Sequence, residues 1–110
     1  MLRTQLLAIP DGGHYPDNPP DGPPRFPSTY FYGGEENPLL GVQWVNGDTT
    51  AWTQIGFEDQ GGGEPTVHAF TIPPGATSYE TGMSYGILSG TAVWVRHTRG
   101  GTPSDWVEAS

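Results

Sequence analysis

The stretch LLGVQWV at residues 39–45 decides the fold class, and the turn signal Asn46-Gly47-Asp48 follows it directly. Leu40, Val42 and Trp44 alternate with smaller or polar neighbours, which is the period of a β-strand with one buried face. Asn and Gly tolerate a positive φ, so Asn46-Gly47 is typical of a tight turn. The stretch therefore predicts a strand over 39–45 that ends in a turn.

Further strands are predicted downstream of this turn. Residues 51–58 form the first, with Ile55 and Phe57 facing inward and Trp52 and Gln54 facing outward. Glycine and proline clusters then separate a strand over 66–72, a short piece that begins at 77–79, and a strand over 91–98. In this last strand Val93 and Val95 point one way, and Trp94 and Arg96 point the other way. Short strands at such regular intervals are typical of an antiparallel sandwich or barrel. No stretch has helical periodicity, so the predicted fold class is all-β and antiparallel.

The segment before residue 39 has a different composition. Eight of the twelve prolines lie between Pro10 and Pro38, and each proline removes a backbone donor and restricts its neighbour. We therefore expect residues 1–38 to form an extended Pro/Gly-rich arm, with a possible short strand at 4–9, and residues 39–110 to form the sandwich. The aromatic run Tyr30-Phe31-Tyr32 is expected to be either the first strand of the domain or an anchor on another protein.

The charge balance excludes several classes of partner. The net charge is −8, and all four cations are arginines, which argues against nucleic-acid binding. The apolar run at 6–9 is far too short for a membrane span, so no membrane partner is expected. The chain has no cysteine, which excludes disulfides and thiolate sites.

No combination of residues indicates catalysis. A Ser-His-acid triad would have to be assembled from distant parts of the chain, and adjacent acids such as Glu35-Glu36 face opposite ways on a strand or are solvated in a loop. The three histidines, His14, His68 and His97, are far apart and have no metal-ligand spacing. We therefore expect no catalytic residue, no cofactor and no metal, and the chain is not expected to be an enzyme.

The order of motifs in residues 39–110 carries a family resemblance. Trp44 lies in an early strand, IPPGATSYETG follows at 72–82, and LSGT at 88–91 leads into VWVRHTRGGTPSDW at 93–106. In this order the chain resembles a fibronectin type III domain or, more broadly, an immunoglobulin-like β-sandwich. The resemblance implies that Trp44 and Leu88 are core residues and that a closing hairpin spans 93–107. The family normally carries a Tyr where this chain has Val93.

The closing segment GGTPSDWVEA at 100–109 is similar to the ends of β-modules on bacteriophage tails and virion surfaces. This resemblance implies a non-catalytic virion structural protein, made in the host cytoplasm and located in the virion. The expected function is that of a capsid decoration protein on the phage head, whose partners are the major capsid protein and copies of itself. The alternative is a carbohydrate- or receptor-binding module of a phage tail or a secreted bacterial assembly, with a glycan as partner.

The aromatic residues are the candidates for binding. If Trp44 is buried, alternation places Trp52 and Trp94 on outward faces, and Trp and Arg are favoured anchors of protein interfaces. Exposed indoles also stack on sugar rings. Coverage of these rings by long loops of the same chain remains the structural alternative. The expected partner-binding residues are Tyr30, Phe31, Tyr32, Trp52, Trp94, Arg96 and Trp106.

Overall fold

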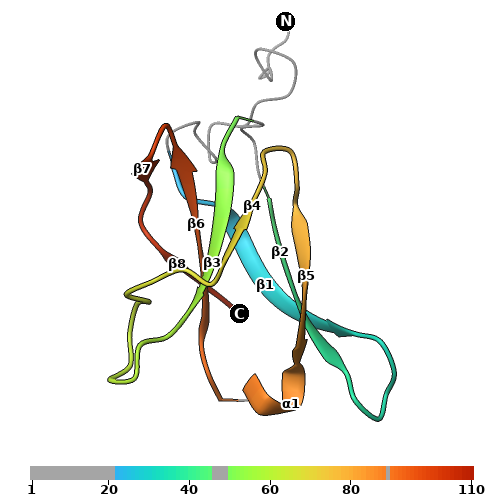
Figure 1. Cartoon of the computed structure of the whole chain (residues 1–110). Helices are drawn as coiled ribbons and strands as arrows, with labels where there is room; N and C mark the ends of the chain where they lie inside the picture. The colour runs from blue at the N-terminus through green and yellow to red at the C-terminus, as the bar shows by residue number, and fades with distance from the viewer. Residues whose placement is uncertain (1–21, 46–49, 89) are drawn as a thin grey trace, which may run out of the picture.

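The computed structural model describes residues 22–45, 50–88 and 90–110. These residues form eight β-strands and a single turn of helix (Figure 1). The elements are β1 (Arg25–Tyr32), β2 (Leu39–Val45), β3 (Trp52–Phe57), β4 (Phe70–Ile72), β5 (Ser78–Ser84), α1 (Tyr85–Leu88), β6 (Val93–Arg99), β7 (Thr102–Pro103) and β8 (Val107–Ala109).

The strands form two antiparallel sheets. One has the order β1-β2-β5, and the other has the order β4-β3-β6-β7, with β8 also paired to β6. The all-β, antiparallel class predicted from the sequence is confirmed, and the arrangement is compatible with an immunoglobulin-like β-sandwich. Among the described residues, no helix has the length and apolar composition needed to cross a membrane.

The core lies between the sheets and follows the predicted alternation. Leu40, Val42 and Trp44 of β2 are buried, as are Ile55 of β3 and both Val93 and Val95 of β6. Gln43 and Val45 face outward and are exposed. Leu88, which the family resemblance placed in the core, is partly buried and packs against it. The inward faces predicted for β2, β3 and β6 are thus confirmed.

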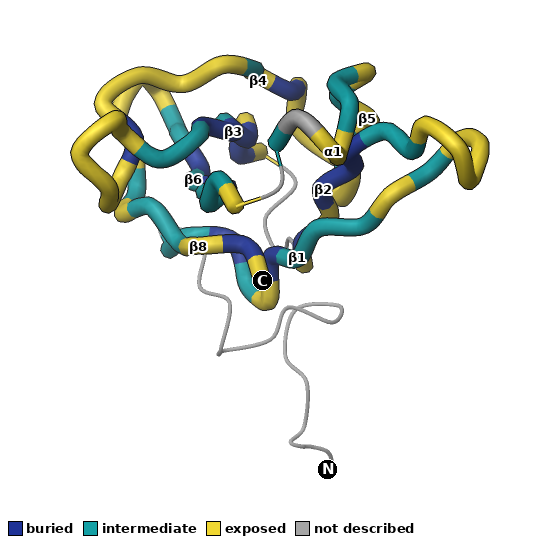
Figure 2. Tube along the Cα trace, turned by 90° about the horizontal axis from the view of Figure 1, so that it is seen from below, coloured by how far each residue is buried: buried dark blue, intermediate teal, exposed yellow. Residues whose placement is uncertain are grey.

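The two sides of the sandwich are closed differently. On one side, the rings of Phe57, Phe70 and Tyr79 form a chain across the gap, with centroids 6.4 Å and 5.1 Å apart. On the other side β8 lies beside β1 (Figure 2), and Ser110 joins the two sheets. Its N–H donates to the Pro27 carbonyl at 3.1 Å, and its carbonyl accepts from the Thr29 N–H at 2.9 Å, which is the pattern of a parallel pair.

The sheet begins within the segment that was expected to form the arm. Residues 25–32 form β1 and pair with β2, so the sheet begins well before the expected boundary at residue 38. Prolines are tolerated here because β1 is an edge strand with a bulge between Arg25 and Ser28. Tyr30-Phe31-Tyr32 therefore belongs to the first strand. The possible strand at 4–9, the arm as far as residue 21 and the turn predicted at 46–48 lie outside the described residues.

The strand expected at 66–72 is shorter than predicted, because only Phe70–Ile72 pairs with β3. The preceding residues follow a loop that returns along β3, where the Ala69 N–H donates to the Ile55 carbonyl at 2.7 Å. Buried Pro65 packs against Gly56, and a Cβ built at Gly56 would lie 2.8 Å from the Pro65 ring. Pro65 and the Ala69 N–H thus hold the loop on β3, while residues 66–69 are exposed and form no strand.

Candidate functional site

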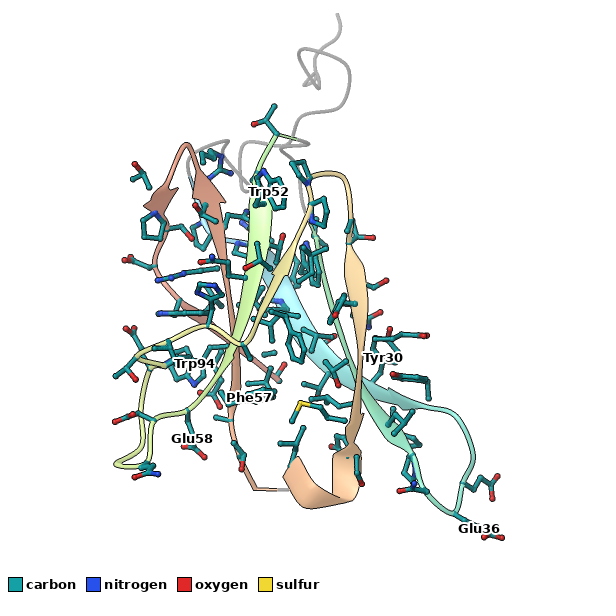
Figure 3. The ribbon with its side chains drawn as sticks, in the orientation of Figure 1. Tyr30, Glu36, Trp52, Phe57, Glu58 and Trp94 are labelled. Carbon is teal, nitrogen blue, oxygen red and sulfur yellow. The ribbon has the colours of Figure 1, made fainter. Side chains whose placement is uncertain are left out.

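The expected binding residues divide between the two sheets instead of forming one site. Tyr30 and Tyr32 lie on the outward face of β1, and Trp94 and Trp52 lie on the outward face of the other sheet. Figure 3 shows Tyr30 and Trp94 pointing away from the core on opposite sides of the molecule. Phe31 faces the other way from its neighbours, because it lies opposite buried Leu40 in the strand register. The structure therefore offers two separate surfaces.

The first surface, which we call the β1 flank, consists of exposed apolar side chains on and beside β1. Phe26 and Phe31 are 70% and 64% exposed, and Val45 and Tyr85 are exposed as well. The four residues form two pairs at the two ends of β1. Val45 lies on β2 opposite Arg25, next to Phe26 at the start of β1, and the ring of Tyr85 lies 5.7 Å from that of Phe31 near its end. These four residues account for four of the six large apolar side chains that are exposed in the described part of the chain.

Phe26 has an unusual backbone. Its φ is 53°, and among the described residues it is the one residue other than glycine with a positive φ. A side chain in this left-handed region costs roughly 1–2 kcal/mol. The Arg25 guanidinium carbon lies 4.6 Å from the centroid of the Phe26 ring. The bulge in β1 thus holds a large apolar ring in solvent at the expense of backbone strain.

Tyr30 and Tyr32 are supported by their neighbours. The Tyr30 ring lies over Gly41 of β2, where no side chain opposes it. The Tyr32 hydroxyl accepts a hydrogen bond from the Gly82 N–H at 2.9 Å, which ties β1 to β5. Both tyrosines are half-buried, so they contribute to the packing of the sheet surface.

The second surface, which we call the outer β3–β6 face, carries the remaining candidates. The strand register places Trp52 opposite Thr98, Gln54 opposite Arg96, and Gly56 opposite Trp94. Trp52 is 44% exposed, whereas Trp94 and Trp106 are half-buried. The outward orientation predicted for Trp52, Gln54 and Trp94 is confirmed. The loop around Pro65 covers Gly56 at one end of this face.

Arg96 occupies the centre of the outer β3–β6 face. Its Nε donates to Oε1 of Gln54 at 2.8 Å, and its guanidinium carbon lies 4.3 Å from the centroid of the Trp106 ring. Gln54 in turn contacts His68, with 3.4 Å between the two Nε2 atoms. Arg96 is therefore held in position by an amide and an aromatic ring.

The structure also adds residues that sequence reasoning missed. Gln54 was assigned to the outward face but not to a binding role, and Phe26 and Tyr85 were not among the candidates. The contact of Gln54 with Arg96 depends on the pairing of β3 with β6, which no local pattern reveals. The exposure of Phe26 depends on a bulge, for which the prolines beside it are the one local signal.

The sandwich also has a cleft at its lower end, between the two sheets. It has a volume of about 300 Å³ and is bounded by Thr29, Leu40, Tyr85, Leu88, the residues from Gly90 to Val93, Glu108 and Ala109. Its lining holds one carboxylate, Glu108, and one phenol, Tyr85. In the parts of the chain that the structure describes, no group of three or more His, Asp or Glu side chains is placed to hold a metal ion.

Comparison of the chain with protein-family models, with curated proteins and with solved structures finds no match.

Proposed function

We propose that this chain is a non-catalytic binding module that attaches to a protein assembly through the β1 flank. More specifically, we propose that it is an immunoglobulin- or fibronectin type III-like decoration protein on the head of a bacteriophage. The strand order supports the fold part of this proposal, since the first, second and fifth strands form one sheet and the third and sixth lie in the other.

Phe26 is the observation that carries the proposal. A phenylalanine that is 70% exposed and has a φ of 53° contributes little to the core and adds backbone strain. Strained residues persist where the surrounding structure imposes them, and they concentrate at functional sites. An exposed aromatic ring held in this way is suited to insertion into a pocket on a partner.

The position of β1 in the chain adds a second argument. β1 directly follows a segment that contains six of the twelve prolines. Exposed apolar patches on small domains commonly mark interaction surfaces. A partner that covers Phe26 would therefore contact the chain a few residues after the N-terminal segment, which is the part of the chain expected to attach.

The test is incorporation into particles. Virus particles assembled in the presence of this chain are purified, and the chain is quantified relative to the shell protein. We expect a fixed ratio for the wild type and a marked loss for the double variant Phe26→Ser, Phe31→Ser. The matched control is Val67→Ser, because Val67 is 74% exposed but lies in the loop before β4, and this variant should be incorporated normally. Absence of the wild-type chain from particles would refute the proposal.

A further inference from the structure

We propose that the outer β3–β6 face binds an acidic sugar, with the Arg96 guanidinium pairing with the sugar carboxylate and Trp52 stacking against the ring. This binding site is independent of the β1 flank and extends beyond the attachment function proposed above. The argument rests on the free donors of Arg96, on the absence of acids from the outward positions of β3 and β6 and on the isolated exposure of Trp52.

Arg96 presents donors that the described residues do not use. Its Nε is bonded to Gln54 and one face of its guanidinium lies against Trp106. Its two terminal amino groups have no acceptor and no carboxylate partner among the described residues. A guanidinium that is already oriented binds a carboxylate through two parallel hydrogen bonds and loses little side-chain entropy on doing so. The free edge of Arg96 is thus prepared for a carboxylate.

The acids of the chain are absent from the outward positions of β3 and β6. The chain has twelve Asp and Glu residues and a net charge of −8, yet none of the outward positions paired between β3 and β6 is acidic. These positions are Trp52, Gln54, Gly56, Trp94, Arg96 and Thr98. The nearest acid in the strand register is Glu108 of β8, which lies opposite Trp94 and one rung from Arg96, on the side away from Trp52. An anion above Trp52 therefore meets Arg96 before it meets this carboxylate.

Trp52 supplies an apolar surface next to the charge. It lies one rung from the Gln54–Arg96 pair on the same face, and such diagonal neighbours have side chains about 7–8 Å apart. Trp52 is the most exposed of the three indoles on this face. The exposed Trp52 ring can stack on a pyranose. The Gln54 amide, the Thr98 hydroxyl and the Arg96 guanidinium beside it can then bind the hydroxyls and the carboxylate of the sugar.

A protein partner fits this face less well. A stable protein interface buries about 800 Å² on each partner around an apolar centre. Here the apolar centre is reduced to Trp52, because Trp94 and Trp106 are half-buried and the neighbouring positions are polar. The larger exposed apolar groups lie on the β1 flank instead.

The experiment measures binding of tetragalacturonate and sialyllactose by isothermal titration, with maltotetraose as the neutral probe. We expect saturable binding of at least one acidic probe and weaker binding of the neutral one. Arg96→Gln and Trp52→Ala should each weaken the acidic probe about tenfold or more. Arg96→Lys should bind with intermediate affinity, because it keeps the charge but loses the paired donors. The matched control is Phe31→Ser, which removes an exposed aromatic ring from the other surface and should bind normally.

Several results would overturn the proposal: no saturable binding of either acidic probe, equal binding of the neutral probe, or unchanged binding by Arg96→Gln and Trp52→Ala. Circular dichroism of each variant establishes that it is folded, and exposed Trp52 provides a test even if Arg96→Gln is unstable. If neither acidic probe binds but both variants fail to enter particles, the face is a protein contact and the sugar proposal is wrong. Loss of particle incorporation by the β1-flank variants alone leaves the sugar measurement unaffected.

Discussion

The ring of Tyr30 on β1 occupies the space in which a side chain of Gly41 on β2 would stand. A Cβ at Gly41 would overlap the tip of this ring, so the absence of a side chain at residue 41 allows the tyrosine to lie flat on the neighbouring strand. The two residues face each other in the register of β1 and β2. The pair therefore fixes how β1 lies against the rest of its sheet.

Gly41→Ala is expected to lower the free energy of unfolding by about 1 kcal/mol, because the Tyr30 ring must leave β2 to make room for the new methyl group. Denaturant unfolding measures the change. Gly34→Ala is the matched control, since nothing lies within 4 Å of a Cβ built there, and it should not destabilise the protein. In a Tyr30→Ala background the cost of Gly41→Ala should disappear. A cost that persists would show that the ring is not its cause.

Gly56→Ala should displace the loop that covers the outer β3–β6 face. A Cβ at this position would lie 2.8 Å from Pro65 and 3.1 Å from Cη2 of Trp106. We expect a loss of about 1–3 kcal/mol in the free energy of unfolding and a red shift of the tryptophan emission as Trp106 becomes more exposed. Gly61→Ala, with open space around it, should leave both measurements unchanged.

Phe26→Gly is expected to leave the free energy of unfolding unchanged or slightly higher. Relief of the left-handed backbone returns roughly 1–2 kcal/mol, and the greater freedom of glycine in the unfolded chain removes about 0.5–1 kcal/mol. Phe31→Gly should instead destabilise by about 1 kcal/mol, because Phe31 has no positive φ and stacks on Tyr85. Thermal unfolding of the two variants compares them directly. Equal destabilisation would mean that the φ of Phe26 carries no strain.

Ser110→Pro tests the junction of the two sheets. The substitution removes the N–H that donates to the Pro27 carbonyl and should cost about 1 kcal/mol. Ser110→Ala keeps both backbone hydrogen bonds and should have the stability of the wild type. Amide hydrogen exchange at Thr29, whose N–H donates to the Ser110 carbonyl, should accelerate in the proline variant alone.

The sequence was sufficient to predict the central strands of the fold. The alternation of Leu40, Val42 and Trp44 is a local property with a period of two, and the structure buries all three. The same reasoning correctly placed Ile55, Val93 and Val95 inside. Clusters of glycine and proline indicated most strand ends, because these residues favour turns and loops.

The errors occurred where distant parts of the chain decide the outcome. Prolines beside Arg25–Tyr32 argued against a strand, yet pairing with β2 and an edge position permit one. The single turn of α1 is too short to show a helical period. At the outer β3–β6 face, the residue types were predicted, but the contact of Arg96 with Gln54 and Trp106 required the register of three strands.

The bond pattern at Ser110 has a mechanical consequence. Because β1 and β8 meet as a parallel pair near the two ends of the described chain, pulling Gly22 and Ser110 in opposite directions slides one strand along the other. Both hydrogen bonds then carry the load together and must break at the same moment, whereas peeling would break them in turn. A module anchored by its N-terminal side would thus resist tension transmitted through its last residue by shear.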